Sequence, residues 1–255
     1  MNNCHQQEFV NFSSPLYPKM PFRKPVLFLL LINLSRLTVT AQPDQGEIPL
    51  LQKLDSIQRS QSVARHFAEL YYSTTVKATD FFLNRSKKEN DFIERFERRF
   101  ADFFFRSADA HMQHIPIPRE WKAYFTDTAL SPLQYKLLGI NAHINGDIWK
   151  VLTDEFSFGE IKENRDSYFS FQKRLKDQYR EFYALSRQSS AKIRLLHATT
   201  AGLDKLYGKM MLTRWRKRQL QLALLYYNNR QRFESRLMKL YKKMDHIDRL
   251  ILRHL

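Results

Sequence analysis

Residues 137–147 read Leu-Leu-Gly-Ile-Asn-Ala-His-Ile-Asn-Gly-Asp, and no other stretch of the chain mixes apolar and polar side chains in so specific an order. On a helix that turns about 100° per residue, the apolar side chains of this stretch point one way. His143 and Asp147 follow one border of that apolar face, and Asn141 and Asn145 follow the other. The pattern predicts a core helix with polar groups at the edge of the core.

A functional interpretation rests on the His143–Asp147 pair, which is four residues apart and can meet across one helical turn. Imidazole nitrogen and carboxylate oxygen on consecutive turns can bind one divalent metal ion or act as an acid–base pair. A metal site needs further ligands, and the candidates are Asp166, His111, Asp127 and His197. This interpretation makes His143 and Asp147 metal ligands of a hydrolase, with Asp166 as a further ligand or base.

A structural interpretation explains the same residues without catalysis. Asp147 would accept a hydrogen bond from His143, and the two Asn side chains would satisfy backbone groups at a helix crossing. Gly139 and Gly146 would let the neighbouring helices approach closely. Spacing alone favours this interpretation, because buried polar groups must be paired whether or not they catalyse a reaction.

The motif resembles the hallmark of a bacterial family of unknown function, domain of unknown function 5995, which reads Leu-Gly-x-Asn-Ala-His-Ile-Asn-x-Asp. The flanks are similar too, and the resemblance covers roughly residues 64–175 through Phe67–Tyr71, Arg99–Phe104, Pro118–Phe125 and Asp166–Leu175. It implies an all-helical domain in which Asn141, His143, Asn145 and Asp147 are the functional positions. In the hydrolase interpretation, the two Asn residues would orient a substrate. The resemblance supplies no reaction. The basic C-terminal region has no counterpart in this pattern.

The rest of the chain also predicts helices. Apolar residues recur at spacings of three and four over 62–83, residues 84–90 form a charged break, and a second helix begins at Asp91. That helix carries an aromatic stripe, which is typical of a core rather than of a cofactor site. The stripe comprises Phe92, Phe96, Phe100, Phe103 and Phe104.

Prolines interrupt or begin the predicted helices in the middle of the chain. Ile115-Pro116-Ile117-Pro118 must be extended, because proline rings remove backbone donors and restrict the preceding residues. Trp121 and Phe125 follow on a short helix. Ser131 is the expected N-cap of the central helix, with Pro132 at its first position. A polar stretch over 159–165 then precedes a helix over 166–189. The fold class is therefore a single all-α helical bundle, with residues 48–200 as its domain.

Residues 1–41 form an N-terminal extension and a signal peptide. The working start is Met20, followed by a basic region, an apolar run over 26–34 and a cleavage point after Ala41. Export to the periplasm or the medium is the expected localisation. The alternative, an uncleaved membrane anchor over 26–41, is disfavoured because the segment is short and contains Arg36. The only cysteine, Cys4, precedes the cleavage point, so the mature chain has no thiol for disulfide or thiolate chemistry.

The C-terminal region, 203–255, accounts for most of the net charge of +16, with 14 Lys and Arg against four Asp and Glu. It reads as one long basic amphipathic helix, packed on the bundle or extending it. Five apolar residues spaced three and four apart form a seam that suits either the bundle or a homodimer. They are Leu237, Leu240, Met244, Ile247 and Ile251.

A cluster of cations around Trp215, formed by Arg214, Arg216, Lys217 and Arg218, could bind a phosphate backbone or an anionic membrane surface. A solvated helix face is the more common outcome for such a cluster. Export argues against nucleic acid as the partner. Two functions follow from the sequence. One is an exported metal-assisted hydrolase acting on a small-molecule or envelope substrate at a polar pocket. The other is a non-enzymatic envelope-associated or scaffolding protein, in which the motif is a structural network and the basic helix binds anionic surfaces or self-associates.

Overall fold

The structure is a computed structural model that describes residues 49–78, 87–126, 129–171, 173, 183–184, 194, 198 and 203–254. The predicted signal peptide, the alternative anchor and most of the predicted helix over 166–189 lie outside these residues. Within the described part the chain is helical and contains no strand, which confirms the all-α fold class. No helix in this part combines the length and apolar character needed to cross a membrane.

The elements in chain order are α1 (Pro49–Gln58), α2 (Arg65–Ala78), α3 (Lys87–Met112), η2 (Arg119–Trp121), α4 (Lys122–Thr126), α5 (Pro132–Ala142), η3 (His143–Asp147), α6 (Ile148–Glu155), α7 (Phe158–Glu163), α10 (Leu203–Asn228) and α11 (Arg230–His254). Element η2 is a short 3₁₀ turn, and η3 is a π-helical turn. Because α5, η3 and α6 follow one another without a gap, they form one interrupted helix over 132–155.

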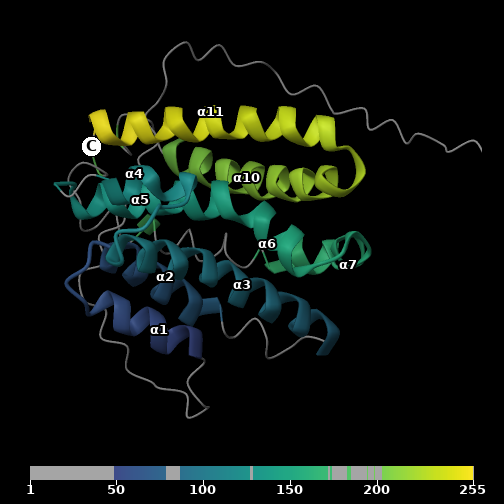
Figure 1. The fold of residues 1–255 in the computed structure, drawn as a ribbon, viewed down its shortest axis with the longest axis horizontal. Coiled ribbons are helices and arrows are strands. Elements are labelled where there is room, and N and C mark those ends of the chain that lie inside the picture. Colours follow the sequence, from purple (N-terminus) through teal and green to yellow (C-terminus); the bar gives the residue numbers. More distant parts are fainter. Residues whose placement is uncertain are drawn as a thin grey trace, which may run out of the picture.

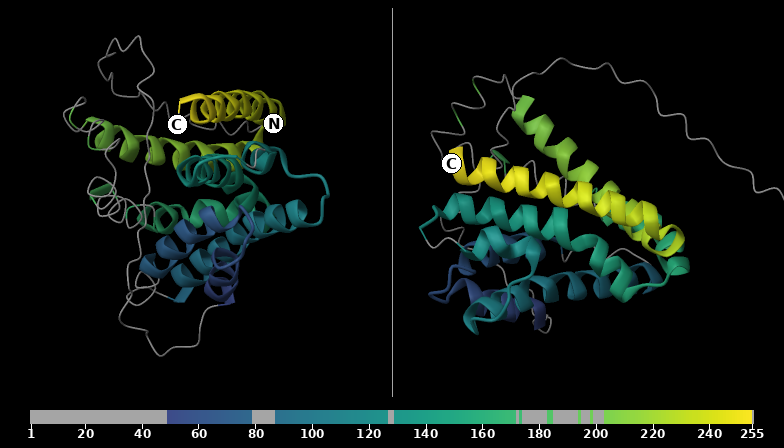
Figure 2. Two further views of the ribbon diagram at one scale, coloured as in Figure 1. Left: turned by 90° about the vertical axis from the view of Figure 1, so that its left-hand side faces the viewer. Right: turned by 45° about the horizontal axis from the view of Figure 1, so that its top comes forward.

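This interrupted helix is the middle layer of the fold. Helices α2 and α3 pack on one side of it, and α10 and α11 pack on the other. Figure 1 shows this order from α1 to α11, and the two further views agree with it (Figure 2). The motif at 137–147 is therefore enclosed by helices from both halves of the chain. Its four polar side chains are fully buried, not at the edge of the core as the pattern predicts.

The core of these layers is rich in aromatic side chains. Phe92, Phe96, Phe100 and Phe104 of α3 are buried, and Phe103 is partly buried, which confirms the aromatic stripe as core. The two motif glycines explain the close packing. A Cβ on Gly139 would overlap the Phe67 ring, and one on Gly146 would lie 2.7 Å from Glu120 Cγ. Both positions thus need glycine, because a neighbouring side chain occupies the space of a Cβ atom.

Local signals place most helix ends. Residues 115–118 are non-helical, and Ser131 caps α5 through a capping box with Gln134, both as predicted. The charged break was wrong at residues 87–90, which begin α3. There Glu89 occupies the first turn, where a carboxylate interacts favourably with the helix dipole.

The predicted break over 159–165 was also wrong, because α7 occupies most of it. Ser157 caps α7 through a capping box with Glu160, which overrides the weak helix propensity of Gly159. Gly159 itself faces open space, so it neither helps nor hinders packing.

The C-terminal region is two helices rather than one long helix. Helix α10 ends at Asn228 and α11 begins at Arg230, so the pair forms a hairpin that Figure 1 shows above the bundle. Asn229 causes the break, because its side-chain oxygen accepts a hydrogen bond from the Arg232 amide (2.9 Å), as an N-cap does.

The apolar seam of α11 packs on its own chain. Leu240, Met244 and Ile251 are buried, Leu237 and Ile247 are partly buried, and α11 contacts α5 and η3. The seam therefore serves the bundle, which is one of the two uses that the heptad spacing allows.

Candidate functional site

The candidate site is centred on the π-helical turn η3, not on the regular helix that the sequence predicts. A π-turn widens the helix locally and is frequent at functional sites. His143 and Asp147 lie at its two ends, and the distance from His143 Nδ1 to Asp147 Oδ2 is 3.2 Å. Both side chains are buried, with 2% of His143 and none of Asp147 exposed. The predicted contact between the pair is thus formed.

The hydrogen bonds around Asp147 favour one tautomer of His143. Trp121 Nε1, which can only donate, donates to Asp147 Oδ2 at 2.9 Å. An oxygen that accepts from Trp121 is suited to accept from His143 Nδ1–H as well. That arrangement leaves the lone pair on His143 Nε2, which is buried and has no hydrogen-bond partner in the described part of the chain.

Aromatic rings enclose the His143 imidazole. Phe100 stacks on it with ring centroids 3.5 Å apart and planes 7° apart, and Tyr71 meets it edge-on at 5.0 Å. Phe67 and Trp121 complete this shell. Burial lowers the pKa of His143 well below its usual value, and Arg216 lowers it further, so the ring is neutral at pH 7.

A chain of polar groups connects Asp147 to the surface. Lys150 Nζ lies 3.8 Å from Asp147 Oδ1 and 2.6 Å from Glu120 Oε2, and the hydroxyl of Tyr241 donates to Glu120 Oε1 at 2.7 Å. Burial raises the pKa of Asp147 to about 8, opposed by Lys150 and by the hydrogen bond from Trp121. The neutral His143 ring therefore lies against a carboxyl group whose pKa is close to 8.

A second group of polar side chains, buried or partly buried, is linked to His143 by a ring contact or by electrostatic interaction. It consists of Tyr71 on α2, Glu97 on α3 and Arg216 on α10, and Arg216 acts electrostatically on the other two and on His143. Tyr71 Oη and Arg216 Nη1 are buried without a hydrogen-bond partner among the described residues. Burial raises the pKa of Glu97 to about 7, and Arg216 opposes this shift. We call His143, Asp147, Tyr71, Glu97 and Arg216 the His143 centre.

The sequence interpretation missed three members of this centre. Glu97 carried a signal, because it lies one turn after buried Ile93 and one turn before buried Ala101. Arg216 was placed in a surface cluster, but it is 5% exposed and Trp215 is 4% exposed. Tyr71 was assigned only to a core helix. Its role depends on a contact with η3, which spacing along the sequence does not reveal.

The two motif Asn residues tie helices together. Asn141 Nδ2 donates to the backbone oxygen of Met244 (3.2 Å) and to Asp248 Oδ1 (2.8 Å), and Asn145 Nδ2 donates to Asn141 Oδ1 (3.1 Å). Gln219 of α10 donates to the backbone oxygen of Asn145 at 2.6 Å. These contacts fasten the interrupted helix to α10 and α11 and so hold the His143 centre in place.

The additional metal-ligand candidates do not join the centre. Asp166 is exposed, and His111 stacks on Phe125 with centroids 4.9 Å apart. Asp127 and His197 lie outside the described residues. Among the residues that the structure describes, no three His, Cys, Asp or Glu side chains are grouped so as to hold a metal ion.

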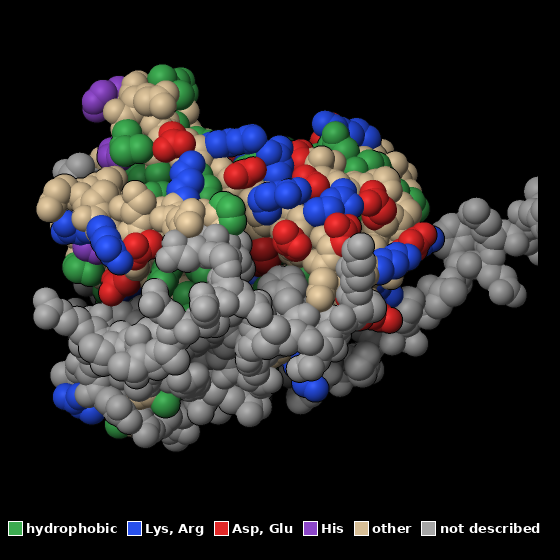
Figure 3. All heavy atoms as spheres, turned by 90° about the horizontal axis from the view of Figure 1, so that it is seen from below, with side chains coloured by type: hydrophobic (Ala, Val, Ile, Leu, Met, Phe, Trp, Pro, Cys, Tyr) green, Lys and Arg blue, Asp and Glu red, His purple; other side chains and the backbone are tan. Residues whose placement is uncertain are grey.

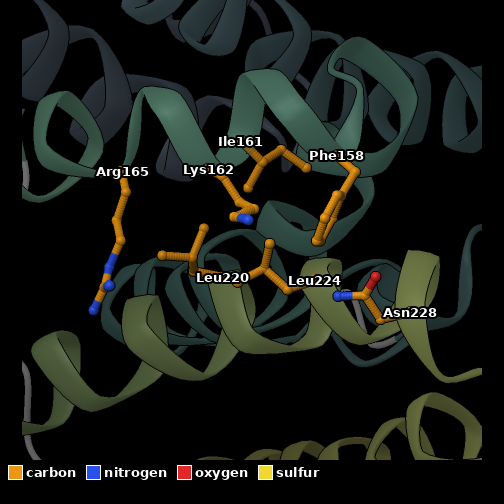
Figure 4. A pocket seen from close by; sticks show the side chains of 7 residues that line it. All are labelled: Phe158, Ile161, Lys162, Arg165, Leu220, Leu224 and Asn228. Carbon is orange, nitrogen blue, oxygen red and sulfur yellow. The ribbon is translucent and has the colours of Figure 1, made fainter. Parts of the chain in front are cut away.

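An apolar groove lies elsewhere, between α7 and α10. Figure 4 shows Phe158, Ile161 and Lys162 pointing toward Leu220 and Leu224, with Arg165 and Asn228 at the two ends of the groove. It contains none of the predicted site residues. Its lining lacks a carboxylate or imidazole, so it offers no acid–base pair like that of the His143 centre.

The comparison with family models confirms the family that the sequence resembles. The family model described as "Family of unknown function (DUF5995)" matches residues 49–254. The match extends beyond the predicted 64–175 and includes the C-terminal hairpin, which the motif pattern alone had left unmatched. No curated protein and no solved structure matched the chain.

Proposed function

The chain belongs to the DUF5995 family of unknown function, and from the chemistry of its centre we propose that it is an enzyme in which His143 is the general base. The proposed reaction is hydrolysis of a small polar substrate. One observation carries the proposal. His143 Nδ1 is held by Asp147, whereas Nε2, Tyr71 Oη and Arg216 Nη1 are buried without partners in the described part of the chain.

Unpaired buried polar atoms are costly, at roughly 1–3 kcal/mol each, and they need an explanation in a folded protein. A polar substrate bound against His143 would satisfy them. Nε2 would take a proton from a water molecule, and Asp147 would stabilise the resulting imidazolium. The Tyr71 hydroxyl and the Arg216 guanidinium are the donors available for negative charge that develops on the substrate.

The metal-assisted version of this hydrolase has weaker support. His143 Nδ1 and Asp147 Oδ2 are committed to each other, and Trp121 also donates to Oδ2. His143 Nε2 would remain as the one ligand atom of this pair. The further candidate ligands Asp127 and His197 lie outside the described residues. Elemental analysis of untagged protein beside His143→Gln tests this version. One transition metal per chain, lost in the variant, would favour it over the metal-independent hydrolase.

The structural alternative applies best to the Asn residues. Their donors are used within the protein, which supports a role in fastening helices rather than in orienting substrate. We assign the structural part of the motif to Asn141 and Asn145 and the chemical part to His143 and Asp147. Asn141→Ala is then expected to lower the melting temperature more than His143→Gln does.

A hydrolase screen tests the proposal. Wild-type protein, His143→Gln and the control His111→Gln are assayed against panels of small esters, amides and phosphoesters. His111 also stacks on an aromatic ring but lies outside the centre. Turnover that falls about 100-fold or more in His143→Gln alone, with folding retained, supports general-base catalysis. Equal turnover in all three proteins, or none in any, contradicts it.

We also propose that the protein acts outside the cytoplasm. The basic region after Met20, the apolar run over 26–34 and Ala41 before Gln42 support this localisation. The substrate would then be a small molecule of the cell envelope or the medium.

A further inference from the structure

The C-terminal hairpin brings five basic side chains onto one surface. Arg214 and Arg218 belong to α10, and Arg236, Lys239 and Lys243 belong to α11. The two helices pack against each other, and Figure 1 shows them side by side along the outer layer of the fold. Arg218 is partly buried and the other four are exposed. We call these five residues the basic hairpin face.

The charges on this face are not balanced by acidic partners. None of the five side chains forms an ion pair with a described residue, whereas other cations of α11 and its surroundings do. Arg230 pairs with Glu234, and Arg119 pairs with Asp245. The basic hairpin face is therefore a group of cations without an acidic partner among the described residues.

The five cations are close enough to repel one another. Burial lowers the pKa of Arg218, and Arg214 and Arg236 lower it further. Arg218 lowers the pKa of Lys243, together with burial, Arg236 and Lys239. All the charged groups that cause these shifts are cations, and they come from both helices. A ligand with several negative charges would relieve this repulsion.

On the opposite side of the molecule, by contrast, cations and anions are mixed. In the view of Figure 3, which is from below Figure 1, Asp and Glu side chains are interleaved with Lys and Arg over the described surface. Elsewhere in the described part of the chain, cations form ion pairs, such as Arg95 with Glu155 and Arg99 with Asp154. The basic hairpin face is thus not a simple consequence of the net charge of +16.

We propose that the basic hairpin face binds the phosphate headgroups of an anionic lipid membrane. Its cations are spread over two neighbouring helices, which suits an extended surface of phosphates. The exposed apolar side chain of Met210 lies one turn before Arg214 and can enter the headgroup region. Trp215, which could stack on nucleic acid bases, is buried, so the aromatic platform typical of single-strand binding is missing at this position. This proposal uses none of the residues of the His143 centre and stands independently of the hydrolase.

Vesicle binding tests the proposal with two variants of equal charge. In the first, Arg214, Lys239 and Lys243 become Gln. In the control, Arg98, Arg106 and Lys122 become Gln, three exposed cations of α3 and α4. The full chain is titrated with phosphatidylcholine vesicles that contain or lack phosphatidylglycerol, at rising sodium chloride. Because each membrane-facing cation contributes about 5-fold in affinity, the hairpin variant should bind on the order of 100-fold more weakly.

The control variant should bind within about 3-fold of wild type, and binding should need phosphatidylglycerol and decline with salt. Equal weakening in the two variants would overturn the proposal, because net charge alone would then explain binding. Undiminished binding in the hairpin variant would overturn it as well. If single-stranded DNA binds through these three residues while anionic vesicles do not, the face is a nucleic acid site and the membrane proposal is wrong.

Discussion

The His143 imidazole lies flat on Phe100, with ring centroids 3.5 Å apart. This stacking, together with the bond from Nδ1 to Asp147, sets the ring's orientation, so that Nε2 is the atom left for chemistry. The geometry joins two distant parts of the sequence, an aromatic stripe on α3 and the polar turn η3. Phe100, a residue of the core, thus acts as a positioning residue for His143, the candidate base.

Phe100→Leu tests this positioning. The substitution is expected to destabilise the fold by about 1–2 kcal/mol, less than the 3–5 kcal/mol of a Phe→Ala truncation, because much of the volume is kept. It should also change the nitrogen chemical shifts of His143. Phe96→Leu removes the same volume from α3, and Phe96 packs on Tyr168 and Phe100 instead. Chemical denaturation and NMR of both variants check the prediction, which is wrong if Phe96→Leu perturbs His143 as much.

Gly139→Ala is expected to be strongly destabilising, by about 1–3 kcal/mol or more, because the new Cβ would overlap Phe67. Phe67 is enclosed by Phe104, Trp121 and His143 and has little room to move. Gly159→Ala is the matched control. A Cβ atom added at Gly159 would have nothing within 4 Å, so the change should be neutral or stabilising by up to about 1 kcal/mol through helix propensity. Equal melting temperatures for the two variants would count against the close approach of α2 to α5.

Asp248→Asn should stabilise the protein at high pH. Burial raises the pKa of Asp248 to about 7, against 3.8 for the ordinary side chain, so the folded state favours the protonated form. The stability from this shift is present below about pH 4 and is lost as the pH rises through about 7. Asn is neutral throughout and keeps the oxygen that accepts from Asn141.

The melting temperature of Asp248→Asn relative to wild type should therefore rise from about pH 4 to about pH 8. The exposed Asp166→Asn serves as a control with the same charge change. A difference from wild type that does not vary with pH would show that Asp248 has an ordinary pKa.

Cleavage after Ala41 is expected when the chain is expressed with its first 41 residues in a bacterial host. The mature protein should begin at Gln42, and intact-mass measurement of the periplasmic fraction checks this. Ala41→Arg should block cleavage, because signal peptidase requires a small residue at that position. Full-length protein that stays in the cytoplasm would contradict the predicted export.

Much of the fold could be predicted from the sequence because local signals dominate it. The capping box at Ser131, the prolines at 116 and 118 and the aromatic stripe of α3 each act within a few residues, and each prediction was confirmed. The contact between His143 and Asp147 was also local, since the two residues are four apart. The spacing of residues in the motif was therefore enough to predict this polar pair.

The errors have nonlocal or competing causes. The π-turn at 143–147 lies where α3, α10 and α11 all contact the interrupted helix. The periodicity of apolar residues in the sequence does not indicate these contacts. Asn229 ended a helix in a region with neither glycine nor proline, because its side chain could cap the next helix. Arg216 looked like a surface cation because its sequence neighbours are basic, but it is buried on α10, a helix that contacts η3. The His143 centre thus depends on contacts between residues far apart in the chain, and the spacing of residues in the sequence could not predict them.

Nitrogen NMR of His143 tests the central claim most directly. In protein labelled with ¹⁵N at histidine, with His143 assigned by comparison with His143→Gln, the account predicts a neutral ring near pH 7 that carries its proton on Nδ1. Nε2 should show the shift of an unprotonated nitrogen, and Asp147→Asn should allow the opposite tautomer. A proton on Nε2, or an imidazolium at pH 7, would contradict the account, because His143 would then have no free lone pair with which to act as a base.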